Sequence, residues 1–104
     1  MNKENLKKLV NEASNIDPQN EILAEINITK RFEEMSENLE STICYLDNCS
    51  ENELFWATEV LEDLAQHFKS QILIDCVVRN IARCCDREIK KQLEITLLYM
   101  KKHI

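Results

Sequence analysis

Ten carboxylates stand between Phe32 and Phe68, and this acidic block contains no lysine or arginine. They are Glu33, Glu34, Glu37, Glu40, Asp47, Glu51, Glu53, Glu59, Glu62 and Asp63. Side chains of this type can bind a divalent cation, exchange protons in catalysis or attract a basic partner. Like charges repel one another in a compact chain and are normally mixed with the opposite sign. A basic partner explains the segregation; the simpler alternative is a set of amphipathic helices with ordinary charged outer faces.

The acidic block offers little to a metal ion. Glu59, Glu62 and Asp63 are spaced so that one helix brings them within reach of a single cation. Metal sites on helices usually add a histidine three or four residues away, but His67 falls on another side of this helix. We therefore expect no metal here.

Five cysteines are present, an odd number without the spacing of a disulfide framework. Cys44 and Cys49 are loosely spaced, and the adjacent Cys84 and Cys85 point about 100° apart on a helix, which disfavours a four-thiolate site. We expect reduced thiols that serve as small apolar residues, and no structural disulfide. The chain also contains no glycine, which excludes glycine-rich phosphate loops, dinucleotide fingerprints and G-x-S-x-G elbows. An enzyme is therefore the least favoured class, and no cofactor is expected.

The absence of glycine and the single proline, Pro18, also predict an all-α fold. Asp17 and Pro18 are typical of a helix start. The apolar residues that follow recur at steps of three and four as far as Leu46, which predicts one long helix, or two with a bend near residues 27–30. A short, weakly amphipathic helix is expected before Asp17.

Three further helix starts are marked by caps. Ser50 and Glu53 form an S-x-x-E capping box before a helix over about residues 51–69. Ser70 and Asp86 cap two more helices, and the first of these has such a wide apolar arc that we expect it to be central. The sequence thus predicts one domain over residues 1–104, with four to five antiparallel helices arranged as a HEAT-like stack of helical hairpins or as a compact bundle.

Helical periodicity gathers the carboxylates into two stripes. One lies on the helical segment before Ser50, and the other lies on the helix after it, where Phe55 stands among the acids and Trp56 is expected to pack against another helix. An aromatic ring in a charged field is typical of an interface anchor. The predicted partner-binding residues are Glu33, Glu37, Glu40, Asp47, Phe55, Glu59, Glu62 and Asp63.

Charge is divided unevenly along the chain. The net charge is zero before the acidic block, −10 within it and +4 after it. The block would repel nucleic acid and anionic lipid, so neither is an expected partner. No apolar run is long enough for a signal peptide or a membrane span, which favours a cytoplasmic location. The basic C-terminal third is expected to lie against the acidic block within the fold or in a second copy.

The segment Glu53–Ala65, ELFWATEVLEDLA, followed by His67–Ser70, HFKS, resembles small HEAT-like helical immunity proteins of bacterial contact-dependent growth inhibition and related polymorphic toxin systems. The likeness covers roughly residues 50–104 and lies in helix layout, size and acidity. It implies a protein that binds and neutralises a basic toxin domain, commonly a nuclease, in the cytosol of the producing cell. The competing interpretation is an intracellular helical adaptor or a self-associating regulator. A monomer or a weak homodimer is expected.

Overall fold

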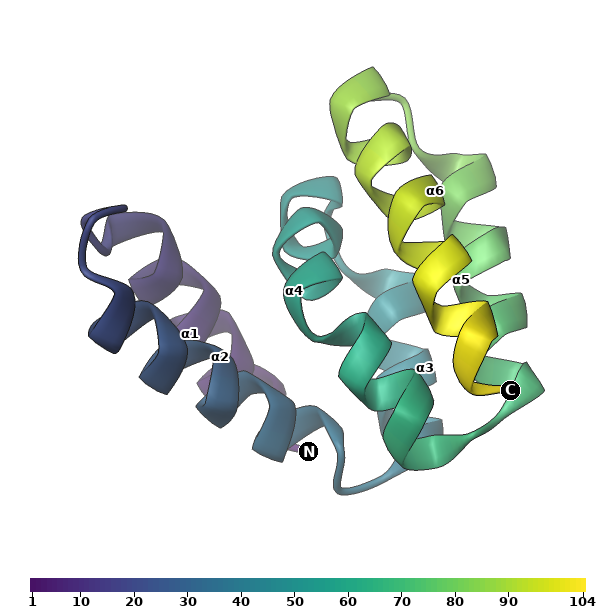
Figure 1. The fold of residues 1–104 in the computed structure, drawn as a ribbon, viewed down its shortest axis with the longest axis horizontal. Helices are drawn as coiled ribbons and strands as arrows, with labels where there is room; N and C mark the ends of the chain where they lie inside the picture. The colour runs from purple at the N-terminus through teal and green to yellow at the C-terminus, as the bar shows by residue number, and fades with distance from the viewer.

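The computed structural model describes all of residues 1–104 and contains only helices (Figure 1). They are α1 (Lys3–Asn15), α2 (Glu21–Met35), α3 (Leu39–Asn48), α4 (Glu51–Phe68), α5 (Gln71–Arg83), α6 (Arg87–Met100) and a final 3-10 turn, η1 (Lys101–His103). The all-α fold class is confirmed. The predicted number of four to five helices is too low, because there are six α-helices.

The extra helix comes from the segment that follows Asp17. Helix α2 begins at Glu21, because the side chain of Asn20 accepts a hydrogen bond from the backbone N–H of Leu23 at 3.1 Å. The chain then leaves the helix after Met35, and Asn38 caps α3 in the same way. The predicted bend near residues 27–30 is therefore wrong, since the break lies at residues 36–38.

The three predicted caps are confirmed. Ser50 and Glu53 form a complete capping box, and the side chains of Ser70 and Asp86 accept backbone N–H groups at the starts of α5 and α6. At the other end of α4, Lys69 adopts a left-handed conformation with φ 48°, the only non-glycine residue of the chain with positive φ. Glycine is the usual residue at this position, and a side chain there carries a steric cost.

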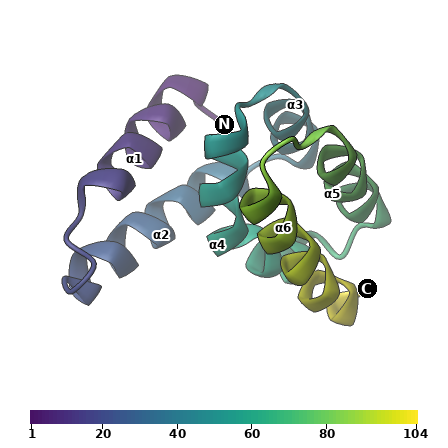
Figure 2. The ribbon, with the colours of Figure 1, turned by 90° about the horizontal axis from the view of Figure 1, so that it is seen from above.

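Two pairs of helices pack in parallel. Helices α4 and α6 are parallel, since Glu51 at the start of α4 meets the start of α6 and Glu62 meets the His103 turn that follows it. Helices α3 and α5 are also parallel, since Cys76 lies near Ile43 and Arg83 near Cys49. Figure 2 shows α4 and α6 running in a similar direction, while α2 crosses the direction of both.

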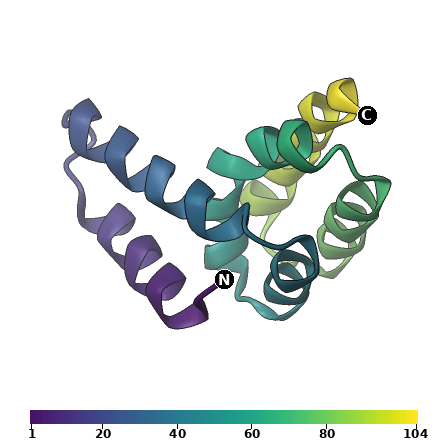
Figure 3. The same cartoon turned by 90° about the horizontal axis from the view of Figure 1, so that it is seen from below.

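Helix α4 occupies the centre of the molecule. Val60, Leu61, Leu64 and Ala65 are completely buried, and α4 packs against both the α1–α2 hairpin and α6. The helix predicted to be central, α5, does pack on both α3 and α6 but lies at one end of the molecule (Figure 3). The prediction that α5 is central is therefore wrong, and its wide apolar arc leaves Val78 exposed. None of the helices combines the length and the hydropathy that a membrane-spanning segment requires.

Candidate protein-binding surface on helix α4

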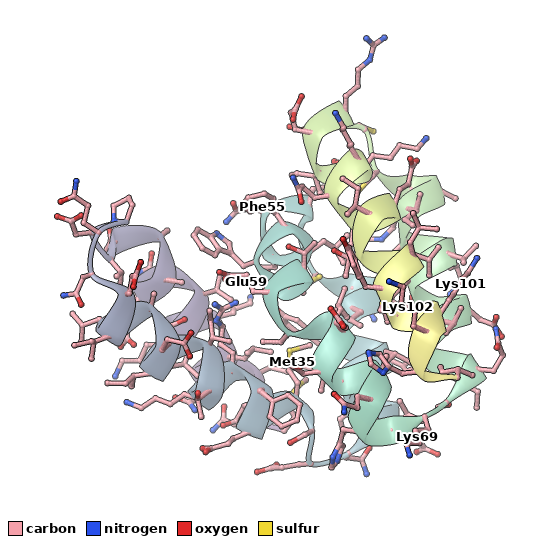
Figure 4. The ribbon with its side chains drawn as sticks, in the orientation of Figure 1. Met35, Phe55, Glu59, Lys69, Lys101 and Lys102 are labelled. Atoms are coloured by element: carbon pink, nitrogen blue, oxygen red, sulfur yellow. The ribbon has the colours of Figure 1, made fainter.

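One edge of α4 presents an acidic and aromatic stripe to solvent. Phe55, Glu59, Glu62 and Asp63 are all exposed, and their steps of four, three and one place them on the side of the helix opposite the buried residues. Figure 4 shows Phe55 and Glu59 along this edge. These four of the eight predicted partner-binding residues are brought together, and we call them the α4 stripe.

Glu59 is held in place by a buried arginine. The guanidinium of Arg31, on α2, is only 2 % exposed and donates to the Oε1 of Glu59 at 2.5 Å. It also donates to the backbone carbonyl of Trp56 at 2.8 Å and to the side-chain oxygen of Asn27 at 2.7 Å. Asn27 in turn donates to the carbonyl of Leu9. This network fixes α4 against both α1 and α2.

The two aromatic rings beside this network have different surroundings. Phe55 is 37 % exposed and meets the Trp56 ring edge to face, with 5.6 Å between the ring centroids. Trp56 is half-buried, has the Arg31 guanidinium 5.9 Å from its ring, and lines a cavity of about 280 Å³ together with Pro18 and Ile28. Trp56 thus packs toward α2, as expected, while Phe55 remains available for contact.

The remaining α4 carboxylates differ in their partners. Glu62 lies 3.1 Å from the Nε2 atom of His103 in the C-terminal turn, so a protonated imidazole would partly neutralise it. Asp63 is exposed and has no ion pair. The α4 stripe therefore keeps a negative charge although Arg31 and His103 approach it from either side.

The other predicted stripe is not a single surface. Glu33 on α2 and Glu37 in the turn after it line a groove between α1 and α2, and Glu37 pairs with the amino group of Met1 at 3.1 Å. Glu33 is two residues from Arg31, so it points about 200° away from the residue that contacts α4. Glu40 is exposed in the first turn of α3. The structure therefore does not join the two stripes into one continuous negative surface.

Asp47 is half-buried and faces α5. It accepts hydrogen bonds from the Nε and Nη2 atoms of Arg79, at 3.3 and 2.8 Å, and from the Nδ2 of Asn80 at 2.9 Å. These bonds, chiefly those from Arg79, hold the pKa of the Asp47 carboxyl below its ordinary value. Here the basic C-terminal third does neutralise part of the acidic block within the fold.

Three further carboxylates of the block, Glu34, Glu51 and Glu53, accept hydrogen bonds at the starts of helices. The sequence pattern predicted this role only for Glu53. Glu51 accepts the backbone N–H groups of Cys85 and Asp86 at 2.8 and 2.9 Å, and these bonds lower its pKa. Glu34 accepts from the N–H of Asn2 and the amide of Asn5, with the same effect. Both contacts join residues about thirty positions apart, so no local signal marks them.

Glu53 completes the Ser50 capping box and also accepts the hydroxyl proton of Tyr45 at 2.7 Å. Burial, and then this neighbouring carboxylate, raise the pKa of Tyr45. All five cysteines are free thiols, and burial raises the pKa of Cys49 to about 11 and that of Cys76 to about 12. No group of three or more histidine, cysteine or acidic side chains is placed to hold a metal ion.

The chain matches no protein-family model, no curated protein and no solved structure.

Proposed function

We propose that this protein is an immunity protein that binds and neutralises a cognate basic toxin domain, a nuclease by expectation, without performing catalysis itself. The observation that carries the proposal is the α4 stripe, in which an exposed aromatic ring and three carboxylates share one helix edge. An aromatic anchor surrounded by charge is the combination that interfaces use for affinity and for fast association.

Charge supports this proposal in a specific way. Nucleases bind a polyanion, so their substrate clefts carry lysine and arginine. A negative helix edge on a rigid scaffold competes for such a cleft, and long-range attraction raises the association rate by roughly 10- to 1,000-fold at low salt. The scaffold is rigid at the α4 stripe, because the ion pair with the buried Arg31 fixes Glu59.

We further propose that the six helices form a HEAT-like stack of three hairpins and that the protein acts in the cytosol of the producing cell, as the resemblance implies. The parallel packing of α4 and α6 supports the stack, since equivalent helices of successive repeats run parallel. In this arrangement α4 is the middle helix of its layer.

The genomic neighbourhood offers the first test. We expect the adjacent upstream gene to encode a large secreted protein that ends in a short basic domain. Coexpression of that domain with this protein should rescue growth of cells that the domain alone kills. If the domain kills equally well in the presence of this protein, the proposal is wrong.

Variants of the α4 stripe test the interface itself. Glu62→Lys combined with Asp63→Lys should slow association with the toxin domain and reduce its salt dependence, while Phe55→Ala should mainly speed dissociation. Glu25→Lys combined with Glu94→Lys makes the same charge change at exposed positions on α2 and α6 and serves as the control. Unchanged association kinetics in the double variant, with the fold intact, would place the interface elsewhere.

A further inference from the structure

A cavity of about 280 Å³ lies between the α1–α2 hairpin and the exposed edge of α4. Its apolar walls come from Ile16, Pro18, Ala24 and Ile28 of the hairpin and from Trp56 of α4. Pockets for small molecules usually measure about 300–1,000 Å³, so the size of this one suits a single large side chain of a partner.

Four polar side chains also line the cavity, and the exposed ones among them are acidic. Arg31 and Asn27 are 2 % and 4 % exposed, and hydrogen bonds tie both of them into the network that fixes α2 to α4. Asp17 and Glu59 are exposed, so a group that enters from solvent meets two carboxylates. Because the charge of Arg31 is already matched by Glu59 in their ion pair, the lining as a whole is negative.

Glu59 is held so that half of its carboxylate stays available. Its Oε1 atom accepts from the Nη2 atom of Arg31 at 2.5 Å, whereas its Oε2 atom has no partner within the chain. A carboxylate has about four lone-pair sites, so it can accept from two guanidinium groups at once. Figure 4 places Glu59 on the side of α4 that faces the α1–α2 hairpin. The cavity therefore combines a fixed acceptor with the indole ring of Trp56.

We propose that this cavity takes one arginine side chain of the basic partner. The guanidinium lies beside the Trp56 ring and donates to Oε2 of Glu59, and the aliphatic stem packs against the apolar walls. This inference rests on the proposed function, because it names the group by which that partner is recognised. Glu59 belongs both to the α4 stripe and to the cavity, and Phe55 meets Trp56 edge to face, so the two surfaces are continuous.

Other occupants fit these groups less well. A carboxylate would add a third acidic group to a lining whose one guanidinium is already paired. A purely apolar side chain would cover Glu59 without a donor for its Oε2 atom, and an unpaired buried acceptor is costly. A lysine ammonium is more strongly hydrated than a guanidinium and cannot stack on Trp56 in the same way, so a largely apolar cavity favours arginine.

The fluorescence of Trp56 tests the cavity without the partner, because Trp56 is the only tryptophan of the chain. Titration with N-acetyl-arginine amide should give a saturable change with a dissociation constant of about 1 mM, the strength expected for one side chain. N-acetyl-citrulline amide has a similar shape without the charge and should bind at least about tenfold more weakly. A response to the arginine derivative that does not saturate, or an equal response to both compounds, would overturn the inference.

Two variants separate the effect of charge from that of shape. Glu59→Gln removes the anionic acceptor, and Ala24→Leu fills the cavity without changing any charge, so each should weaken binding of the arginine derivative at least about tenfold. Asp63→Asn removes one charge from the α4 stripe outside the cavity and should bind like the wild type. Urea unfolding of each variant checks that the fold is intact. An Ala24→Leu variant that folds and binds the derivative as tightly as the wild type would show that arginine does not enter the cavity.

The same variants distinguish this inference from the proposed function when the toxin domain is the ligand. Glu59→Gln and Ala24→Leu should each speed dissociation of the domain at least about tenfold, whereas Asp63→Asn should not. If binding of the domain depends on Phe55 but both cavity variants release it at the wild-type rate, the cavity inference fails and the proposed function stands. If the arginine derivative binds and the toxin domain does not, the proposed function fails and the cavity remains a site for an arginine side chain.

Discussion

Replacing Arg31 with methionine should destabilise the fold by about 2–4 kcal/mol. Methionine keeps most of the side-chain length but removes three donated hydrogen bonds, those to Asn27, Trp56 and Glu59. The amide oxygen of Asn27 is then left without its donor in a site only 4 % exposed, and such a loss costs about 1–3 kcal/mol. The rest comes from the lost connection between α2 and α4.

Glu59 contributes less to this cost than a fully buried partner would. Its side chain is 36 % exposed, so water can hydrate the carboxylate once the guanidinium is gone. Glu59→Gln should therefore cost only about 1 kcal/mol, since the amide oxygen still accepts from Arg31. The effect is thus asymmetric between the two partners of one ion pair.

Urea unfolding followed by circular dichroism measures both effects, and a thermal melt should show Arg31→Met unfolding about 10–20 °C below the wild type. Lys30→Met is the matched control, because the neighbouring side chain is exposed and should change stability by less than about 0.5 kcal/mol. If Arg31→Met were as stable as Lys30→Met, the buried network would not hold the α1–α2 hairpin to α4, and the rigidity argued for Glu59 would fail.

Three further predictions concern stability. Glu51 has a pKa below its ordinary value because it accepts backbone N–H groups at the start of α6. Its contribution to the stability of the fold is therefore present above about pH 4.3 and is lost as pH falls through the pKa of the folded state. Glu51→Gln should flatten the fall in melting temperature between about pH 5 and pH 3, and an unchanged profile would refute this role. Lys69→Gly should raise stability by about 0.5–1 kcal/mol in urea unfolding, because glycine accepts the φ of 48° without strain, whereas Lys69→Ala should not; equal effects would contradict the strain argument. Leu64→Ala should cost about 2–5 kcal/mol, because Leu64 is completely buried at the centre of the core, while Leu98→Ala at the exposed end should cost little in a dilute sample.

The starts of the last three helices were predictable from the sequence, whereas the start predicted at Asp17 and Pro18 is wrong, because α2 begins at Glu21. Ser50, Ser70 and Asp86 act on backbone groups two or three residues away, so their roles are visible in the sequence. Asn20 and Asn38 work by the same chemistry, but Asp17 and Pro18 indicated an earlier start for α2, and the apolar step from Met35 to Leu39 runs across Asn38 and conceals that break. A cap signal inside a regular hydrophobic pattern is therefore easily overruled by the pattern.

The partners of the carboxylates were not predictable in the same way. Asp47 meets Arg79 across 32 positions, and Glu59 meets Arg31 across 28. Helical periodicity predicts which side of its own helix a residue occupies. Which residues of other helices lie next to that side depends on how the helices pack. Arg31 lies directly before the acidic block in the sequence. A count of charges within the block therefore leaves out the buried cation that pairs with Glu59.

The sequence by itself determined the all-α class, the caps of the last three helices, the segregation of charge and the side of α4 on which Phe55 and the acids lie. These are consequences of backbone chemistry and of helical repeat, which act over a few residues. Only the tertiary structure decided that α4 and not α5 is central, that Asp47 turns inward while Asp63 stays exposed, and that the two acidic stripes are separate. Those outcomes depend on which helix faces bury the most apolar surface together, a property of all the helices at once.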